Sequence, residues 1–142
     1  LARVCDAYVQ LLHDLLSSSS VDGARHHIEG VAVATVGSSL KRLLQAPPQD
    51  DSMVVGGKYG LACYIDSSWP VVLYLAHRYL ENPLKGLLQN TNLGGENCHR
   101  GAVLGTLLGA ASGCRLALFE QLRHPDEIQS EITAAMEVPA PC

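Results

Sequence analysis

Hydrophobic positions recur along most of this chain with the spacing of amphipathic helices. In residues 1–16 they fall at positions 1, 4, 5, 8, 11, 12, 15 and 16, which is a stripe with a period near 3.6 residues. The four serines at 17–20 end this helix as a polar loop. A second helical stretch is predicted from about residue 23 to residue 44, and three valines weaken the prediction in its middle, at positions 31, 33 and 36.

Turn signals divide the rest of the chain. Residues 46–60 carry paired prolines, acids and glycines, which predicts a long loop with Asp50 and Asp51 in a solvated turn. Ser68 stands before Trp69 and Pro70, a pattern that predicts an N-cap and a helix start at that point.

The later part of the chain also has helical patterns. Asn82-Pro83 predicts a short helix to about residue 92, and a longer helix is expected from about residue 100 to residue 122. His124-Pro125 breaks it and starts a last helix, to about residue 137. Because no stretch alternates as a strand, we predict an all-α fold in residues 1–142.

Composition narrows the functional classes. The chain has 142 residues, of which 47% are hydrophobic and 17% charged, and a net charge of −4, as expected for a globular domain with a core. The basic residues are scattered, which argues against nucleic-acid binding. The most apolar stretch, residues 101–114, is too short to cross a bilayer, so no membrane span is expected.

The five cysteines are dispersed, without a CxxC pair. This pattern indicates reduced thiols, most of them buried, in a cytoplasmic or other reducing intracellular compartment. The sequence starts at Leu1, inside a helical pattern with no capping residue before it. We therefore expect either a single helical domain or, preferably, the C-terminal fragment of a larger one.

Residues 90–113 carry the two most specific features. Glycines recur at every fourth position, at 101, 105, 109 and 113, which places them along one helix face. Each costs about 0.8–1 kcal/mol of helix propensity relative to alanine, so a closely packed neighbouring helix is expected there.

The second feature is the sequence GGENCHR at residues 94–100, directly before the glycine-rich helix. The paired glycines favour a turn, and free N–H groups at a helix start favour anions. Glu96, Cys98 and His99 carry atoms that bind cations. On these residues alone, a capped helix start is favoured over a ligand site.

This segment resembles the C-terminal motif of the ADP-ribosylglycohydrolase family, Gly-Gly-Asp-x-Asp-Thr followed by a helix with Gly-x-x-x-Gly-Ala. The residues that match in register are Gly94, Gly95, Gly105, Gly109, Ala110 and Gly113. Upstream, YIDSSWP at residues 64–70 resembles the family's Tyr-Val-x-x-Thr-x-Pro. The resemblance is strongest over residues 59–113.

The resemblance implies an orthogonal bundle of α-helices with a pair of Mg²⁺ ions in a central cleft. In the family these ions hold ADP-ribose, or a related nucleotide sugar, and the water that cleaves its N- or O-glycosidic bond. It also implies that a ligand contacts five positions of this chain, which are Tyr64, Ser68, Gly94, Gly95 and Asn97. No residue is assigned as catalytic.

The metal ligands depart from the family pattern. Glu96 replaces the first aspartate, Cys98 the second, and His99 the threonine. Thiol and imidazole groups suit a softer metal such as Zn²⁺ better than Mg²⁺. The family's other ligands come from an acidic cluster near the start of a domain about twice this length, and no part of this chain aligns with it.

Other residues have plainer interpretations. His26 and His27 are expected at the helix surface, because adjacent helical side chains diverge by about 100°. Ser68 is a cap in preference to a nucleophile, and the neighbouring Cys98 and His99 are not expected to form a dyad.

Two functions remain open. The first is metal-dependent hydrolysis of an ADP-ribosyl glycosidic bond by the intact parent protein, with the 142-residue chain alone inactive. The second is a catalytically inactive scaffold or binding relative of the same family, as some crystallins are. A sugar-cleaving activity with a softer metal is a third, weaker hypothesis.

Overall fold

The stripe predicted for the first helix is buried only in part, because its members Leu1, Cys5 and Leu16 are exposed. In the computed structural model, which describes residues 1–113 and 119–137, α1 spans Ala2–Ser17 and α2 spans Val21–Thr35. Leu11 and Leu15 of α1 are buried. The Ser20 side chain accepts a hydrogen bond from the backbone N–H of Gly23, an N-cap that starts α2 after the serine loop.

The predicted helix over residues 23–44 is two helices, so this prediction was wrong. After α2, α3 begins anew and spans Ser38–Leu44. Gly37 has a φ of 123°, a conformation that favours glycine. The backbone N–H groups of Val36 and Gly37 both donate to the carbonyl of Ala32, which closes α2 before the chain turns.

The predicted loop over residues 46–60 was also wrong in its second half. Residues Asp51–Val54 form α4, and Val55–Tyr59 form a π-helical turn that continues it. Asp50 caps α4 through the backbone N–H of Ser52. Asp51 is buried, not solvated as predicted, because hydroxyl and guanidinium groups from a later helix surround its carboxylate.

The central helix, α5, spans Ile65–Tyr79 and starts earlier than predicted. Its N-cap is Tyr64, whose carbonyl accepts from the backbone N–H groups of Ser67 and Ser68. Ser68 is therefore a helical residue and not a cap. Pro70, in the second turn, removes only the donor to the carbonyl of Asp66, an exposed residue.

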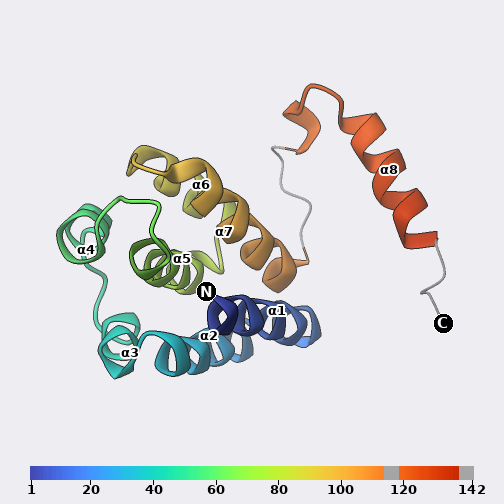
Figure 1. Ribbon diagram of the computed structural model, residues 1–142. Helices are drawn as coiled ribbons and strands as arrows, with labels where there is room; N and C mark the ends of the chain where they lie inside the picture. The colour runs from blue at the N-terminus through green and yellow to red at the C-terminus, as the bar shows by residue number, and fades with distance from the viewer. Residues whose placement is uncertain (114–118, 138–142) are drawn as a thin grey trace.

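Helices α6 and α7 complete the bundle. They span Pro83–Asn92 and Asn97–Ser112, and α7 ends at Gly113 in the left-handed conformation. Helices α5 and α7 pack on the α1–α2 pair, with α6 on their other side (Figure 1), and α5 contacts α2, α3, α6 and α7. The buried residues of α5 join Leu104, Leu107 and Leu108 of α7 in the main hydrophobic core.

The helix predicted over residues 100–122 is shorter than expected at its C-terminal end. Residues 114–118 lie outside the described part of the chain, and Phe119–Gln121 form a 3₁₀ turn. The last helix, α8, spans Pro125–Glu137, as predicted, and has no buried residue. It stands apart from the other helices in Figure 1.

The described residues contain helices and no strand, so the all-α prediction is confirmed. None of the helices in the described residues has the length and apolarity needed to cross a membrane. The prediction that most cysteines are buried was wrong for the three that the structure describes, because Cys5, Cys63 and Cys98 are all exposed. Cys114 and Cys142 lie outside the described residues.

Candidate functional site

The double-glycine turn before α7 depends on glycine for two reasons. Gly94 and Gly95 have φ angles of 70° and 66°, in the left-handed region that disfavours side chains. A Cβ on Gly95 would lie 2.5 Å from both the Cβ and the carbonyl oxygen of Leu61. The N–H of Glu96 donates to that same carbonyl at 3.1 Å. The turn is therefore held against the segment that leads into α5.

A buried arginine holds the turn from its other side. Arg100 Nε donates to Asn90 Oδ1 at 2.6 Å, and its Nη2 donates to the carbonyl oxygens of Gly94 at 2.9 Å and Asn90 at 3.3 Å. Asn90 Nδ2 in turn donates to the carbonyl of Asn97 at 2.9 Å. Asn90 and Arg100 are 2% and 3% exposed, so α6, the turn and α7 form one hydrogen-bonded unit.

A cavity of about 240 Å³ opens between α5 and α7 beside this turn. Each helix lines it with residues at i, i+3, i+4 and i+7, the spacing of one helix face. They are Ile65, Ser68, Trp69 and Val72 of α5, and Glu96, His99, Arg100 and Val103 at and beyond the start of α7, with Cys63 at the side. The lining is largely apolar and includes the charged side chains of Glu96 and Arg100.

Glu96 lies at this cavity and pairs with a histidine. Its Oε1 lies 2.6 Å from Nδ1 of His99, with the two side chains 37% and 88% exposed. Cys98 takes no part in this pair, since its exposed thiol contacts the side-chain oxygen of Asn97 at 3.6 Å. The turn thus brings together two of the three predicted metal ligands.

Of the residues predicted to contact a ligand, some line the cavity and others do not. Ser68 lines the cavity. Tyr64 is 73% exposed and lies outside the lining. The Asn97 side chain donates to the carbonyl of Thr91 at 3.2 Å, which is a structural contact within the turn.

Comparison with known proteins gives the family. The family model described as ADP-ribosylglycohydrolase matches residues 2–139. The chain belongs to the ADP-ribosylglycohydrolase family. Membership confirms the family that the sequence resembles, and it implies ADP-ribosylated substrates. No curated protein and no solved structure matches the chain.

The α5–α7 cavity lacks the ligands that a magnesium ion requires. Magnesium prefers several oxygen ligands in octahedral geometry. The α5–α7 cavity offers one carboxylate, Glu96, already paired with His99. Within residues 1–113 and 119–137, no three His, Cys, Asp or Glu side chains lie close enough to hold an ion. These residues do not supply a magnesium site by themselves.

Trp69 and Arg100 are among the cavity residues that the sequence did not indicate as site residues. Trp69 was treated only as part of a helix start, and Arg100 only as a boundary of the apolar helix. The available signal was that both belong to the i, i+3, i+4, i+7 faces described above. The packing of α5 on α7 decides which face of each helix lines the cavity. The periodicity of one helix does not indicate which face of another helix it meets.

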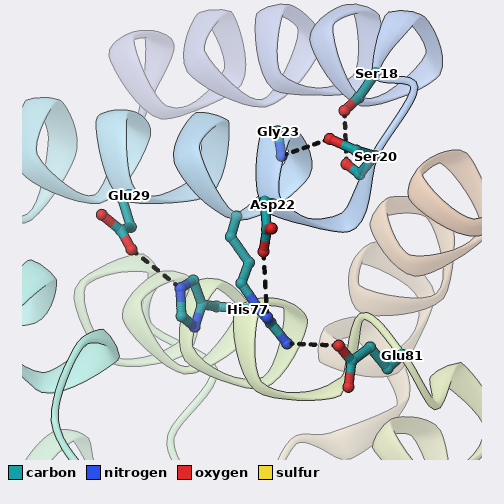
Figure 2. Close-up of polar contacts among 8 residues, drawn as sticks. Ser18, Ser20, Asp22, Gly23, Glu29, His77 and Glu81 are labelled. Carbon is teal, nitrogen blue, oxygen red and sulfur yellow. Dashed lines mark hydrogen bonds and ion pairs between the residues drawn. The ribbon is translucent and has the colours of Figure 1, made fainter.

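A second polar cluster lies on another side of α5. His77 Nε2 is 3.3 Å from Glu29 Oε1, and Arg25 pairs with Asp22 and Glu81 (Figure 2). Burial lowers the pKa of His77. The cavity beside this cluster, about 280 Å³ in volume, shares no lining residue with the α5–α7 cavity. His26 and His27 lie at the surface of α2, as predicted.

Proposed function

We propose that this protein binds an ADP-ribosyl unit at the α5–α7 cavity and takes part in hydrolysing its N- or O-glycosidic bond. The observation that carries the proposal is the position of Glu96. A turn that only glycine can make, held by Leu61 and Arg100, places the Glu96 carboxylate at the rim of a cavity. The family model matches residues 2–139 of this chain.

The chemistry of the bond explains why a carboxylate is useful there. Hydrolysis adds water across the bond between the anomeric carbon and the departing nitrogen or oxygen. A carboxylate within reach orients the water and accepts its proton as the bond to carbon forms. Glu96 is suited to that role, and its Oε1 contacts His99 Nδ1.

A metal ion belongs to the same proposal. Glu96 and His99 are the pair that would contact it, and Cys98 would need to rotate away from Asn97 to join them. Mg²⁺ at this point requires further oxygen ligands, whereas Zn²⁺ accepts imidazole and thiolate.

Calorimetric titration tests the proposal. ADP-ribose is titrated into the protein with and without Mg²⁺ or Zn²⁺, and release of ADP-ribose from an ADP-ribosylated protein is measured on the intact protein. We expect Glu96→Gln to weaken metal-dependent binding of ADP-ribose by about tenfold to a hundredfold, the loss usual for a metal-site residue. Glu127→Gln, on the exposed first turn of α8, is the matched control.

The second candidate function is an inactive scaffold of the same family. The observation that favours it is the single carboxylate at the turn, paired with His99 in place of a further acid. Absence of ADP-ribose binding with either metal would support the scaffold and contradict the hydrolase. Binding and turnover that Glu96→Gln leaves unchanged would contradict the role of Glu96.

A further inference from the structure

Arg100 carries a charge in a place where charge is costly. Its residue is 3% exposed, and the oxygen atoms that accept its hydrogen bonds are one side-chain amide and two backbone carbonyls. No carboxylate of the described residues lies within ion-pair distance of its guanidinium. Buried arginines are ordinarily paired with an acid.

One arm of this guanidinium faces no protein partner. The hydrogen bonds of Arg100 involve Nε and Nη2, and no described residue accepts from Nη1. The side chain lines the α5–α7 cavity. Across the cavity, the hydroxyl of Ser68 also lacks a hydrogen-bond partner among the described residues, and this residue too belongs to the lining. Two donors therefore line one small space.

The electrostatics of the site point in the same direction. Burial lowers the pKa of Arg100, and the charge of Glu96 acts against that effect. Glu96 also lines the cavity but lies beyond ion-pair distance of Arg100, so an anionic oxygen bound to the guanidinium would provide the direct counter-charge that the amide and carbonyl groups lack. Charge-assisted bonds from a guanidinium to phosphate are short and about twice as strong as neutral ones.

We propose that the α5–α7 cavity holds a phosphoryl group on Arg100 Nη1 and Ser68 Oγ, with Trp69 forming an apolar wall. This inference rests on the proposed function and deepens it, because it assigns the phosphate part of a nucleotide sugar to named residues. The planar guanidinium is fixed by Asn90 and Gly94 before any ligand arrives. Binding therefore needs little rearrangement of this side chain.

Trp69 allows a direct test on the unaltered protein. It is the chain's single tryptophan and it lines the cavity, so its fluorescence reports occupancy. Inorganic phosphate, inorganic diphosphate and ADP-ribose are titrated separately at constant ionic strength. We expect a saturable change with at least one of them. Comparison of the three titrations shows whether the cavity binds free phosphate or the diphosphate of a nucleotide. No saturable change with any of the three would overturn the proposal.

Variants then test Arg100 itself. Arg100→Met should weaken phosphoryl binding by about tenfold or more, the usual effect of losing a charged hydrogen bond. Arg100→Lys keeps the positive charge but loses the planar guanidinium. Its affinity for the phosphoryl group should lie between those of Arg100→Met and the unaltered protein. Arg25→Gln is the control, because the ion pairs of Arg25 lie outside this cavity. This variant should keep the affinity of the unaltered protein. Equal affinity in Arg100→Met and the unaltered protein would overturn the proposal.

Two further measurements keep the outcome clear. Because Arg100 also holds the glycine turn, circular dichroism and urea unfolding establish whether Arg100→Met folds. Ser68→Ala, which leaves the turn intact, should lower the affinity even if Arg100→Met does not fold, and an unchanged affinity would count against the proposal. Phosphoryl binding without hydrolysis by the intact protein would support this inference and contradict the hydrolase. Hydrolysis without phosphoryl binding would support the hydrolase and contradict this inference.

Discussion

Gly101 and Gly109 lie two turns apart on α7 and meet different surroundings. A Cβ on Gly101 would lie 2.9 Å from Asn90 Nδ2, whereas nothing lies within 4 Å of a Cβ on Gly109. Gly105 is intermediate, with Leu87 Cδ2 at an ordinary contact distance of 3.6 Å. The close packing predicted for this glycine series therefore holds at one position, and the structure offers no packing reason for Gly109.

Alanine substitutions should separate these positions. Gly109→Ala is expected to raise the free energy of unfolding by about 0.8–1 kcal/mol, because alanine is the better helix former and the space is open. Gly101→Ala should lower it, since the methyl group displaces the Asn90 amide from its bond to Asn97. Urea unfolding measures both, and stabilisation by both substitutions would contradict the packing described for Gly101.

The glycine turn shows which site residues a sequence can reveal. Paired glycines before a helix indicate a turn through local geometry alone, and Gly94 and Gly95 have the left-handed angles that this requires. The position of Glu96 beside them follows from the same local pattern. Arg100 differs, because its role depends on Asn90 of the preceding helix and on the face of α5 opposite.

At the scale of elements, α4 is held by contacts that are distant in sequence. The Asp51 carboxylate accepts hydrogen bonds from the hydroxyl groups of Tyr74, at 2.9 Å, and Tyr79, at 2.5 Å, and its Oδ1 lies 2.9 Å from Arg78 Nε. Burial and the hydrogen bond to Asp51 raise the pKa of the Tyr74 hydroxyl. Both hydroxyl groups therefore remain protonated donors near neutral pH.

This arrangement explains why the sequence predicted a loop at this point. The tyrosines follow Asp51 by 23 and 28 residues, so nothing in the local pattern of paired acids and glycines indicates burial. By contrast, α1, α6 and α8 were predicted from periodicity and capping residues within each segment. Local signals define these helices, and only the folded arrangement explains α4.

Removal of the Asp51 carboxylate should destabilise the protein strongly. Asp51→Ala leaves two buried hydroxyl groups and Arg78 without their acceptor, and breaking a buried ion pair costs about 3–5 kcal/mol. The neighbouring Asp50→Ala, which removes only an exposed helix cap, should cause a smaller loss. Urea unfolding of the two variants compares them, and an equal loss would show that Asp51 acts as a turn residue.

At the scale of the whole molecule, one carboxylate joins three helical segments. Glu29 of α2 accepts a hydrogen bond from Gln45 Nε2, just after α3, at 2.8 Å, and contacts His77 of α5 (Figure 2). Lys41 Nζ lies 3.9 Å from the same carboxylate. Both Glu29 and His77 are largely buried, with 15% and 12% of their side chains exposed. The all-α prediction did not indicate this junction, because its members lie on separate segments.

The protonation of His77 should make the stability of the whole bundle depend on pH. Burial lowers the pKa of His77 below its ordinary value of 6.5, although the hydrogen bond and charge of Glu29 act in the opposite direction and Arg25 adds to the lowering. On acidification the unfolded chain therefore takes up this proton before the folded chain does. Neutral His77 therefore contributes fully to stability at a pH above 6.5, its ordinary pKa. This contribution is lost as the pH falls through the lowered pKa of the folded state.

Urea unfolding over a series of pH values measures this effect. The free energy of unfolding should fall as the pH is lowered from about 7.5 to about 5.5, and His77→Gln should flatten that slope. His26→Gln, on the exposed side of α2, serves as the control and should keep the slope of the unaltered protein. Because Glu29 and Arg25 act on this histidine and Lys41 contacts Glu29, a slope that survives His77→Gln would place the responsible proton on another group. A flattened slope in His77→Gln would show that protonation at the α2–α5 contact destabilises the bundle at low pH.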